Sequence, residues 1–560
     1  MESSNQGGTT AGNIFSGPIG EFCREHNLLQ PDADGVQRIP FLIKGQLRLP
    51  GPIAMDTIRQ AFADKECGRP LSSAPVTHVT IGETQVAREP VIDRQAMTHT
   101  GQYLYSVMPV FQATEVIEKD FGRLCRELYS LPFEEILSFL RALGETFAAS
   151  RSFLDHVREA TLPTALLPDR WHRAGFDTIE LLLDEGNARR MVDNDLCAWN
   201  LPGTRFLDGW VPLTEAPVFP EPVHLMAAEI FREPDKAWRP RVPTLRAMPT
   251  RQLHITAGNA PQIPLFSALR AILTKSPAVV KSPYGATIPG ALLALAMATG
   301  RPDHPVTRHL SIVYWPGGDE SVESAFFAPG SFDRIVVWGA PEAVESVKKR
   351  AVFTKVLTFN PRYGISMIGR EAFAGDIRHV ADRTLADSLV ANQKACIASQ
   401  IHYVEGDDDQ LKAYAEALRQ GLERFDQYAP NYIEPFFEGE IKRLMRGMLI
   451  DADWYINRTN GRFSSGVVVV NREFPLSCLT MQRMIIVRKV GALSDVLSYL
   501  HPGVSTVSIF PPARREELRD VIAAAGVSNI VDIGQSGTIY PGQSHDGMMV
   551  LTELVDWKNG

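Results

Sequence analysis

Residues 254–342 decide the fold of this chain. The stretch begins with HITAGNAP at 254–261, continues with AVVKSPY at 278–284 and ends with RIVVWGAPE at 334–342. Each apolar run is short enough for a strand, and the segment 265–273 repeats apolar residues at helical spacing. Strands that alternate with helices predict a parallel, doubly wound sheet of the α/β class.

Further elements are predicted on both sides of this stretch. Helical spacing recurs at 132–147 and 411–422, and apolar runs at 467–470 and 484–487 predict strands. Residues 39–49 predict two strands around a glycine turn. A chain of 560 residues exceeds one typical domain, so at least two packed cores are expected.

Composition argues against several classes of protein. The net charge of −8 and the pI near 6.0 argue against a nucleic-acid-binding surface. The six cysteines are scattered without a C-x-x-C pair, which predicts free thiols in a reducing cytoplasm and no metal site. The polar N-terminus does not resemble a signal peptide. The weakly polar stretch 286–299 is shorter than the ~20 apolar residues of a transmembrane helix, so no transmembrane segment is expected.

One cysteine stands out because of its neighbours. The run NQKACIASQ at 392–400 places Cys396 among small and amide residues, just before the strand-like run 401–404. A thiol at such a turn can be an accessible nucleophile that holds an acyl group as a thioester. The alternative is a buried cysteine that acts as a small hydrophobic residue, which is the more common fate of a lone cysteine.

Two strand ends are candidate nucleotide contacts, although neither a G-x-G-x-x-G motif after a strand nor a P-loop motif is present. Gly339-Ala340-Pro341 follows a strand and opens a helix, whose free N–H groups suit a pyrophosphate. Without a ligand it would be a tight turn. Lys281 ends a buried-looking strand and could bind ribose or phosphate, or simply reach solvent.

In order and spacing, these segments resemble the aldehyde dehydrogenase superfamily. An Asn-containing loop (255–261), a strand ending in Lys, a strand ending in a Gly turn and the Cys396 loop follow one another. Within that superfamily the chain resembles the long-chain acyl-thioester reductases of bacterial luminescence operons, the LuxC type. The resemblance runs from about residue 38 to the end and includes the blocks 545–547 and 554–557.

The resemblance implies an aldehyde-dehydrogenase-like fold. It has two doubly wound α/β domains and a small oligomerisation element, and it forms homo-oligomers. The predicted division is a poorly ordered extension at 1–35, a cofactor-binding domain with an N-terminal helical region at 36–357, and a catalytic domain at 358–535. Residues 536–560 are predicted to return to the body and to the oligomer interface.

The resemblance also implies site residues. Cys396 is the nucleophile, and Asn259 forms the oxyanion hole with the Cys396 backbone N–H, unless Asn259 only caps the following turn. The implied cofactor contacts are Thr256, Ala257, Lys281, Ser282, Tyr284, Gly317, Trp338, Gly339, Ala340 and Thr358. NAD-preferring members often carry Glu where this chain has Tyr284. A 2′-phosphate would meet no carboxylate there and could be bound by Lys281 and Ser282, which predicts NADPH.

One departure from the superfamily pattern concerns hydrolysis. Aldehyde-oxidising members activate water with a Glu upstream of the cysteine, and the matching segment 357–361 has Thr358 near that position. No carboxylate lies between Leu357 and Gly369, so hydrolysis of the acyl-enzyme should be weak. His545 could donate a proton or shape the entrance, but a hydrogen-bonded loop histidine is the preferred interpretation.

The predicted function is NADPH-dependent reduction of a fatty acyl thioester to the aldehyde through an acyl-enzyme on Cys396. The acyl donor would be acyl-CoA or acyl carrier protein, with an acyl-transferring enzyme as a further partner. A cysteine-dependent acyltransferase or thioesterase, which would need no nicotinamide, is one alternative. Aldehyde oxidation in the same fold is the other.

Overall fold

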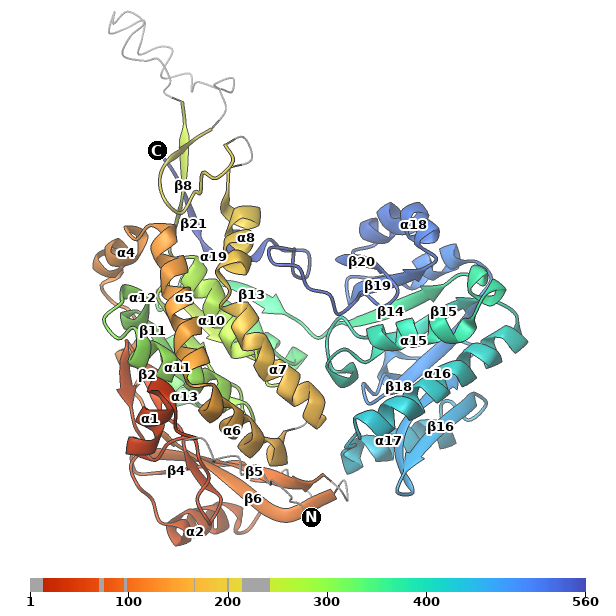
Figure 1. Cartoon of the computed structure of the whole chain (residues 1–560), viewed down its shortest axis with the longest axis horizontal. Helices are drawn as coiled ribbons and strands as arrows, with labels where there is room; N and C mark the ends of the chain where they lie inside the picture. The colour runs from red at the N-terminus through yellow and green to blue at the C-terminus, as the bar shows by residue number, and fades with distance from the viewer. Residues whose placement is uncertain (1–13, 70–74, 95–97, 166, 199–200, 214–241) are drawn as a thin grey trace, which may run out of the picture.

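The computed structural model describes residues 14–69, 75–94, 98–165, 167–198, 201–213 and 242–560. Two α/β bodies lie side by side, each with a seven-stranded sheet (Figure 1). We call the sheet that contains β9–β13 the first sheet and the one that contains β14–β20 the second sheet. The α/β class and the doubly wound arrangement predicted from the sequence are confirmed.

The first sheet has the order β13-β12-β9-β10-β11-β2-β3. The five strands from β13 to β11 in this order are parallel. A short antiparallel hairpin of β2 and β3, which turns at Gly45 with φ of +78°, forms the other edge. The strands are β9 (Gln252–Ile255), β10 (Ala278–Lys281), β11 (Leu310–Val313), β12 (Arg334–Trp338), β13 (Lys355–Phe359), β2 (Phe41–Ile43) and β3 (Gln46–Arg48).

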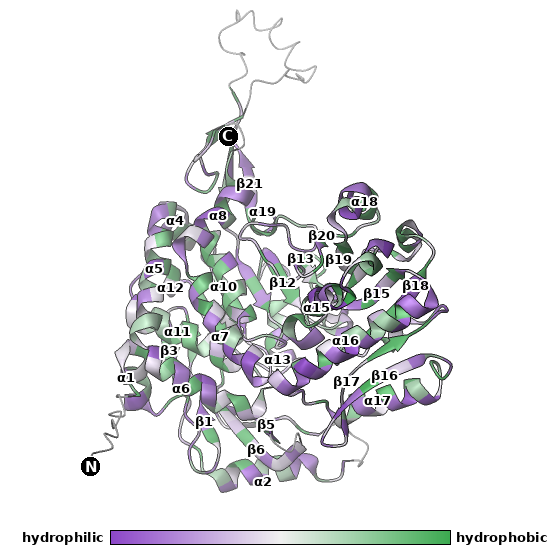
Figure 2. Ribbon diagram, turned by 45° about the vertical axis from the view of Figure 1, so that its right-hand side comes forward, coloured by the Kyte–Doolittle hydropathy of each residue, from purple (hydrophilic) through white to green (hydrophobic). Residues whose placement is uncertain are grey.

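Helices cover both faces of the first sheet. Figure 2 shows α10 and α11 as largely hydrophobic, and nearly all residues of both are buried, because α5 and α7 cover their outer side. This burial on all sides explains why α11 lacks a polar face. The helices of this body are α4 (Phe121–Tyr129), α5 (Phe133–Ala149), α6 (Arg151–Thr161), α7 (Asp169–Leu182), α8 (Glu185–Leu196), α10 (Ile263–Leu273), α11 (Thr287–Gly300), α13 (Glu320–Phe326) and α14 (Pro341–Arg350).

The second sheet has the order β16-β17-β18-β15-β14-β19-β20 and is parallel except for β16. Helices α15 and α16 cover one face, while α17 and α18 cover the other. The strands are β14 (Tyr363–Ile368), β15 (Ser399–Glu405), β16 (Asp453–Thr459), β17 (Arg462–Val469), β18 (Met484–Val490), β19 (Val504–Phe510) and β20 (Asn529–Asp532). The helices are α15 (Ile377–Ser388), α16 (Asp408–Tyr428), α17 (Pro435–Arg446) and α18 (Pro512–Ala524).

The N-terminal region differs from the prediction of poor order through residue 35. Residues 17–26 form α1, whose Ile19 and Cys23 are buried against α5 and α11, so the prediction is wrong for this part. Residues 1–13 lie outside the described residues. A four-stranded sheet of order β1-β6-β5-β4 follows and was not predicted. It consists of β1 (Val36–Arg38), β4 (His78–Ile81), β5 (Thr84–Asp93) and β6 (Thr98–Pro109), with α2 (Met55–Glu66) against it.

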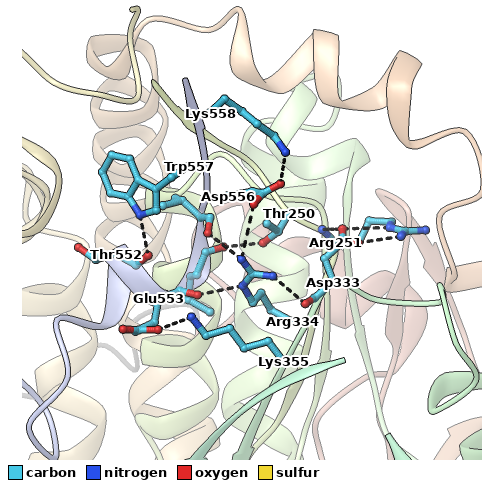
Figure 3. Close-up of polar contacts among 12 residues, drawn as sticks. Thr250, Arg251, Asp333, Arg334, Lys355, Thr552, Glu553, Asp556, Trp557 and Lys558 are labelled. Atoms are coloured by element: carbon cyan, nitrogen blue, oxygen red, sulfur yellow. Dashed lines mark hydrogen bonds and ion pairs between the residues drawn. The ribbon is translucent and has the colours of Figure 1, made fainter. Parts of the chain in front are cut away.

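The C-terminal segment returns to the N-terminal ends of β12 and β13 (Figure 3). Arg334 donates to the carbonyl oxygens of Glu553 and Val555 at 3.0 and 2.9 Å, and Lys355 pairs with the Glu553 carboxylate. Thr250 donates to the Leu554 carbonyl at 2.5 Å. These bonds hold α19 (Val550–Leu554), while β21 (Asp556–Asn559) extends the small sheet of β8 (Thr244–Met248) and β7 (Val211–Pro212).

The connection between the two sheets is short. β13 ends at Phe359 and β14 begins at Tyr363, so the carboxyl edge of the first sheet meets the amino edge of the second. The predicted domain division at 357/358 falls inside β13, because Thr358 still pairs with Val337 of β12. The Pro-rich stretch 212–243, which its sequence predicts to be an extended connection, lies mostly outside the described residues.

We expect Gly364→Ala to destabilise the second domain. A Cβ at Gly364 would lie 2.4 Å from the carbonyl oxygen of Ile397, which is backbone and cannot move aside cheaply. Overpacking of this kind typically costs ~1–3 kcal/mol. Urea unfolding would measure the loss. Gly144→Ala in α5 is the matched control, because a Cβ there meets nothing within 4 Å and should stabilise the helix by ~0.5–1 kcal/mol. A Gly364→Ala midpoint equal to that of the unmodified protein would contradict the packing argument.

Candidate active site

The first sheet has its topological switch point at β9. The chain runs from β9 through β10 to β11 on one side and then returns to place β12 and β13 on the other. Ligands of open α/β sheets bind outside the carboxyl ends of strands where the order reverses. The loops at this point are 256–262 after β9 and 339–340 after β12, which include four of the predicted cofactor contacts.

Three of the predicted contacts meet beside this switch point. The Thr256 hydroxyl donates to the Lys281 carbonyl at 2.5 Å, which ties the end of β9 to the end of β10. A Cβ at Gly258 would lie 3.0 Å from the Tyr284 carbonyl oxygen, so the two loops pass close to each other. Thr256, Lys281 and Tyr284 therefore lie close together at the carboxyl ends of β9 and β10.

The Lys281 ammonium is available to a ligand. It lies over the rings of Tyr314 and Trp315, 5.4 and 5.1 Å from their centroids. It makes no hydrogen bond or ion pair with the described residues. Burial lowers its pKa to about 8, while the charge of Glu323 raises it. Glu323 itself accepts hydrogen bonds from Arg350 and Trp315, which occupy both of its oxygens.

Tyr284 and Ser282 face different surroundings. The Tyr284 hydroxyl donates to the Arg88 carbonyl of β5 at 2.6 Å, so the N-terminal sheet, which was not predicted, lies against Tyr284. Ser282 is buried, and a Cβ at Gly290 of α11 would lie 2.3 Å from its hydroxyl oxygen. The Ser282 hydroxyl therefore faces α11, which leaves its predicted phosphate contact without support from the geometry.

Of the remaining predicted cofactor contacts, some leave room for a ligand and others are packed against the protein. Gly317 is exposed, with nothing within 4 Å of where its Cβ would be, and Ala340 is the residue before the first turn of α14. Both leave room for a ligand. Trp338, by contrast, stacks on Phe359 with ring centroids 4.0 Å apart, on the face of the sheet that packs against α10 and α19. Thr358 lies between Leu357 and Phe359 and is half-buried.

The Cys396 loop begins with an unusual backbone. Ala391, Asn392 and Gln393 are consecutive non-glycine residues with φ of 47°, 57° and 67°. Left-handed backbone is rare outside glycine and asparagine, and each such residue costs free energy unless surrounding contacts enforce it. The turn directs the chain out of α15 and back to the amino end of β15, where Cys396 lies.

A buried arginine enforces this turn. Arg483 is 0% exposed and donates to the Asn392 side chain at 2.6 Å, to the Asp426 carboxylate at 2.6 Å and to the Ala429 carbonyl at 2.8 Å. The Gln393 side chain bonds both the N–H and the carbonyl of Met484, at 2.9 Å each. The side chains of Asn392 and Gln393 thus both have hydrogen-bond partners inside the second domain.

Cys396 is partly buried at the amino edge of the second sheet. The Ser505 hydroxyl, at the start of β19, donates to the Cys396 carbonyl at 2.6 Å. Burial and the charge of Asp546 raise the pKa of the Cys396 thiol to about 11. Its own backbone N–H, that of Ile397 and the Arg362 guanidinium act in the opposite direction. The thiol is therefore protonated at neutral pH before substrate binds.

His545 is a hydrogen-bonded loop histidine, as preferred from the sequence. Arg270 donates to its Nδ1 at 3.0 Å, and its ring lies 4.7 Å from Phe359 and 5.2 Å from Trp338. Burial together with the charges of Arg270 and Arg362 lowers its pKa to about 3. At neutral pH the imidazole is therefore neutral and has no imidazolium proton to give.

Sequence reasoning missed Asp546. Its carboxylate lies 3.7 Å from the Arg362 Nε, and its charge raises the pKa of the Cys396 thiol, although Asp546 is 150 residues away from Cys396 in the sequence. The neighbouring His545 block was recognised, but a lone carboxylate in a loop carries no signal of its own. Asn259 is exposed in the loop after β9, and no hydrogen bond joins it to Cys396 among the described residues, so its oxyanion role stays a prediction.

Neither a metal-binding group nor a membrane-spanning helix is found among the described residues. Within these ranges no group of three or more His, Cys, Asp or Glu side chains could hold a metal ion. None of the helices described is both long enough and apolar enough to cross a membrane.

Comparison with known families gives one match over more than half of the chain. Residues 231–557 match the model of the family described as acyl-CoA reductase (LuxC). The match includes the switch-point loops, the Cys396 loop and the C-terminal segment.

Curated relatives are named as long-chain acyl-protein thioester reductases. A long-chain acyl-protein thioester reductase from Photorhabdus laumondii subsp. laumondii is 30% identical over 329 residues, covering 56% of this chain and 64% of the relative. One from Aliivibrio fischeri is 24% identical over 433 residues, covering 77% and 82%. With the Photorhabdus protein the chain thus aligns over less than two thirds of the relative's length.

Solved structures share the fold. The NAD-dependent aldehyde dehydrogenase from Sinorhizobium meliloti superposes with a TM-score of 0.62 at 12% identity, covering 95% of this chain and 97% of that one. The NADP-dependent glyceraldehyde-3-phosphate dehydrogenase from Bacillus halodurans, complexed with NADP, gives 0.60 at 11% identity, covering 85% and 95%. The chain therefore has an aldehyde-dehydrogenase-like fold.

We expect the Cys396 thiol of the unliganded protein to titrate late. Its alkylation by iodoacetamide should still rise above pH 9, with a midpoint near 11, because burial and Asp546 disfavour the thiolate. Mass spectrometry of the Cys396 peptide measures this, and the exposed Cys67 is the internal reference for the reagent. Asp546→Asn should lower the midpoint, because it removes a nearby negative charge. A midpoint at or below ~8.5, the value of an unperturbed thiol, would contradict the assigned environment.

Proposed function

The chain belongs to the acyl-CoA reductase (LuxC) family, and from this we propose that it reduces a fatty acyl thioester to the aldehyde through an acyl-enzyme on Cys396. One observation supports this more than any other. Cys396 lies at the amino edge of the second sheet, which is joined by three residues to the carboxyl edge of the first, and both edges lie within the matched region.

The acyl donor that we propose is a long-chain acyl thioester. The curated relatives are named long-chain acyl-protein thioester reductases, which supports a carrier that is itself a thiol, either CoA or the prosthetic group of a carrier protein. An acyl-transferring enzyme would be a partner in this scheme. Assembly into homo-oligomers is proposed from the superfamily resemblance alone.

The nicotinamide cofactor that we propose is NADPH. The residues at the switch point fit such a group, because the Lys281 ammonium makes no hydrogen bond or ion pair with the described residues and no side chain caps the amino end of α14. Tyr284 offers an aromatic ring where a carboxylate would repel a 2′-phosphate. When bound, the cofactor would supply the hydride. Lys281, Thr256 and the loop 339–340 would hold and orient it.

The chain's own residues supply the acyl chemistry. The Cys396 thiol attacks the thioester carbonyl, and the charge that develops on the oxygen is met by the Cys396 backbone N–H and by Asn259. Thr358 and its neighbours provide no carboxylate to activate water, so the acyl group should wait for hydride rather than hydrolyse. The missing carboxylate also makes aldehyde oxidation to the free acid the weaker interpretation.

The acyl-enzyme should form without cofactor and persist. Incubation with long-chain acyl-CoA should add one acyl group to the intact mass, and NADPH should remove it with release of aldehyde. Slow hydrolysis is expected because a well-placed base is worth ~10²–10⁴-fold in rate. Cys396→Ala should give no adduct, whereas Cys478→Ala, which changes a buried thiol elsewhere, should still give it. Full reductase activity in Cys396→Ala would refute the assignment. Equally rapid decay with and without NADPH would favour a thioesterase.

A second measurement concerns cofactor preference. Tyr284→Glu should weaken NADPH binding about tenfold relative to NADH, because a carboxylate near the 2′-phosphate adds repulsion of ~1.4 kcal/mol. Fluorescence titration with both cofactors measures the ratio. Tyr284→Phe is the matched control, since it removes only the hydroxyl that bonds the Arg88 carbonyl. If the unmodified protein binds NADH as tightly as NADPH, the proposed preference is wrong.

A further inference from the structure

Helix α7 is linked by contacts to both loops that the proposed acyl transfer needs. Figure 1 shows it on the side of the first body that faces the second, and it packs against α10 within its own body. Trp171 and Gly175 are four residues apart in this helix, so they lie on the same face, about one turn from each other. Trp171 contacts the second domain, whereas Gly175 contacts the loop after β9.

At Gly175 the helix comes close to the loop that carries Asn259. A Cβ on Gly175 would lie 2.5 Å from Cγ and 2.9 Å from Cδ of Pro261, and 3.1 Å from Oε1 of Gln262. Glycine inside a helix is less stable than alanine, and this close approach explains its presence here. Pro261 is two residues after Asn259, and its ring is bonded to its own backbone. A side chain at position 175 would therefore displace the loop.

At Trp171 the same helix reaches the buried arginine that holds the Cys396 turn. The Arg483 guanidinium lies 5.6 Å from the centre of the Trp171 ring and 5.5 Å from that of Phe425. The two rings are themselves 5.0 Å apart. Because Arg483 is fully buried, water does not screen its attraction to these rings. Arg483 in turn donates to Asn392, four residues before Cys396, at 2.6 Å.

A neighbouring residue fixes the same end of α7 to the second domain. Arg170 donates to the Tyr428 hydroxyl at 2.6 Å, and its guanidinium lies 3.7 Å from the centre of the Tyr428 ring. Tyr428 and Phe425 both belong to α16, which covers one face of the second sheet. The helix is thus anchored on the second domain near its amino end and packs on the loop 256–262 one turn later.

We propose that α7 fixes the position of the Asn259 loop relative to the Cys396 loop during acyl transfer. Trp171 and Gly175 are the positioning residues. The inference rests on the proposed function, in which Asn259 stabilises the charge on the carbonyl oxygen that Cys396 attacks. The two loops belong to different domains, so a contact between the domains must set their separation. A donor stabilises the oxyanion only at hydrogen-bond distance, so a small shift of either loop removes its contribution.

The test measures acylation alone, as release of CoA in a single turnover with long-chain acyl-CoA and without NADPH. Gly175→Ala should be about 10²-fold slower, which is a typical loss when one oxyanion donor is removed. Gly144→Ala in α5 is the matched control, because a Cβ there meets nothing within 4 Å and the rate should stay unchanged. Alkylation of Cys396 by iodoacetamide forms no oxyanion. Its rate should be equal in both variants, which shows that the thiol is still in place.

A double variant separates positioning from a general effect on folding. Asn259→Ala alone should also slow acylation about 10²-fold. Gly175→Ala added to Asn259→Ala should slow it by no more than about twofold further, because the donor that the helix positions is already gone. A purely structural defect would instead multiply the two losses.

The amino end of the helix gives an independent test. Trp171→Ala removes one of the two rings beside Arg483 and should slow acylation about tenfold, whereas Trp171→Phe keeps a ring and should restore most of the rate. The loss in Trp171→Ala should likewise disappear when Asn259 is replaced by alanine. Urea unfolding shows whether Gly175→Ala folds, and if it does not, the Trp171 variants carry the test.

Three results would overturn the inference. If folded Gly175→Ala or Trp171→Ala acylates at the unmodified rate, or if either loss multiplies with that of Asn259→Ala, α7 does not position this loop, and the proposed function is untouched. If Asn259→Ala acylates at the unmodified rate, Asn259 is not a donor that α7 could position, while the acyl-enzyme still stands. If the unmodified protein forms no adduct on Cys396, the proposed function fails and this inference with it.

Discussion

The arrangement of the whole molecule depends on the three residues that join β13 to β14. Four residue steps separate Phe359 from Tyr363, and an extended chain covers at most about 14 Å in that number of steps. The carboxyl edge of one parallel sheet is therefore held next to the amino edge of another. In open α/β sheets the carboxyl edge is where ligands bind, so a nucleophile at the facing edge is brought to the ligand by chain connectivity alone.

A second connection makes the junction specific. The C-terminal segment leaves the second sheet after β20, passes between the two edges at His545–Met548 and ends on the first sheet, where Arg334 and Thr250 bond its backbone carbonyls. The junction is thus crossed twice, by the 360–362 connection and by this segment. Truncation of the last residues would remove the anchor of the turn that carries Asp546, although those residues lie at the far end of β12 and β13.

The cysteine loop shows how local strain is held by tertiary contacts. Three successive left-handed residues would not persist in a peptide, because each is sterically unfavourable without glycine. Here Arg483 and Gln393 supply the compensating hydrogen bonds, and Arg483 is itself buried and paired with Asp426. Removing one partner of such a buried pair usually costs ~3–5 kcal/mol. The rigidity of the nucleophile loop therefore depends on Arg483, which lies 91 residues downstream of Asn392.

Local pattern in the sequence was sufficient for much of this protein. The alternating strands and helices of both domains, the hairpin at Gly45 and the helix α5 follow from periodicity and turn chemistry, which act between near neighbours. The order of the Asn259, Lys281, Gly339 and Cys396 segments is informative through the family resemblance. The tertiary structure alone decided the rest. The contact of the N-terminal strand β5 with Tyr284, the orientation of Ser282 toward α11 and the pairing of Asp546 with Arg362 each depend on contacts between distant segments. No local pattern can reveal these contacts, because burial and charge proximity are properties of the packed chain.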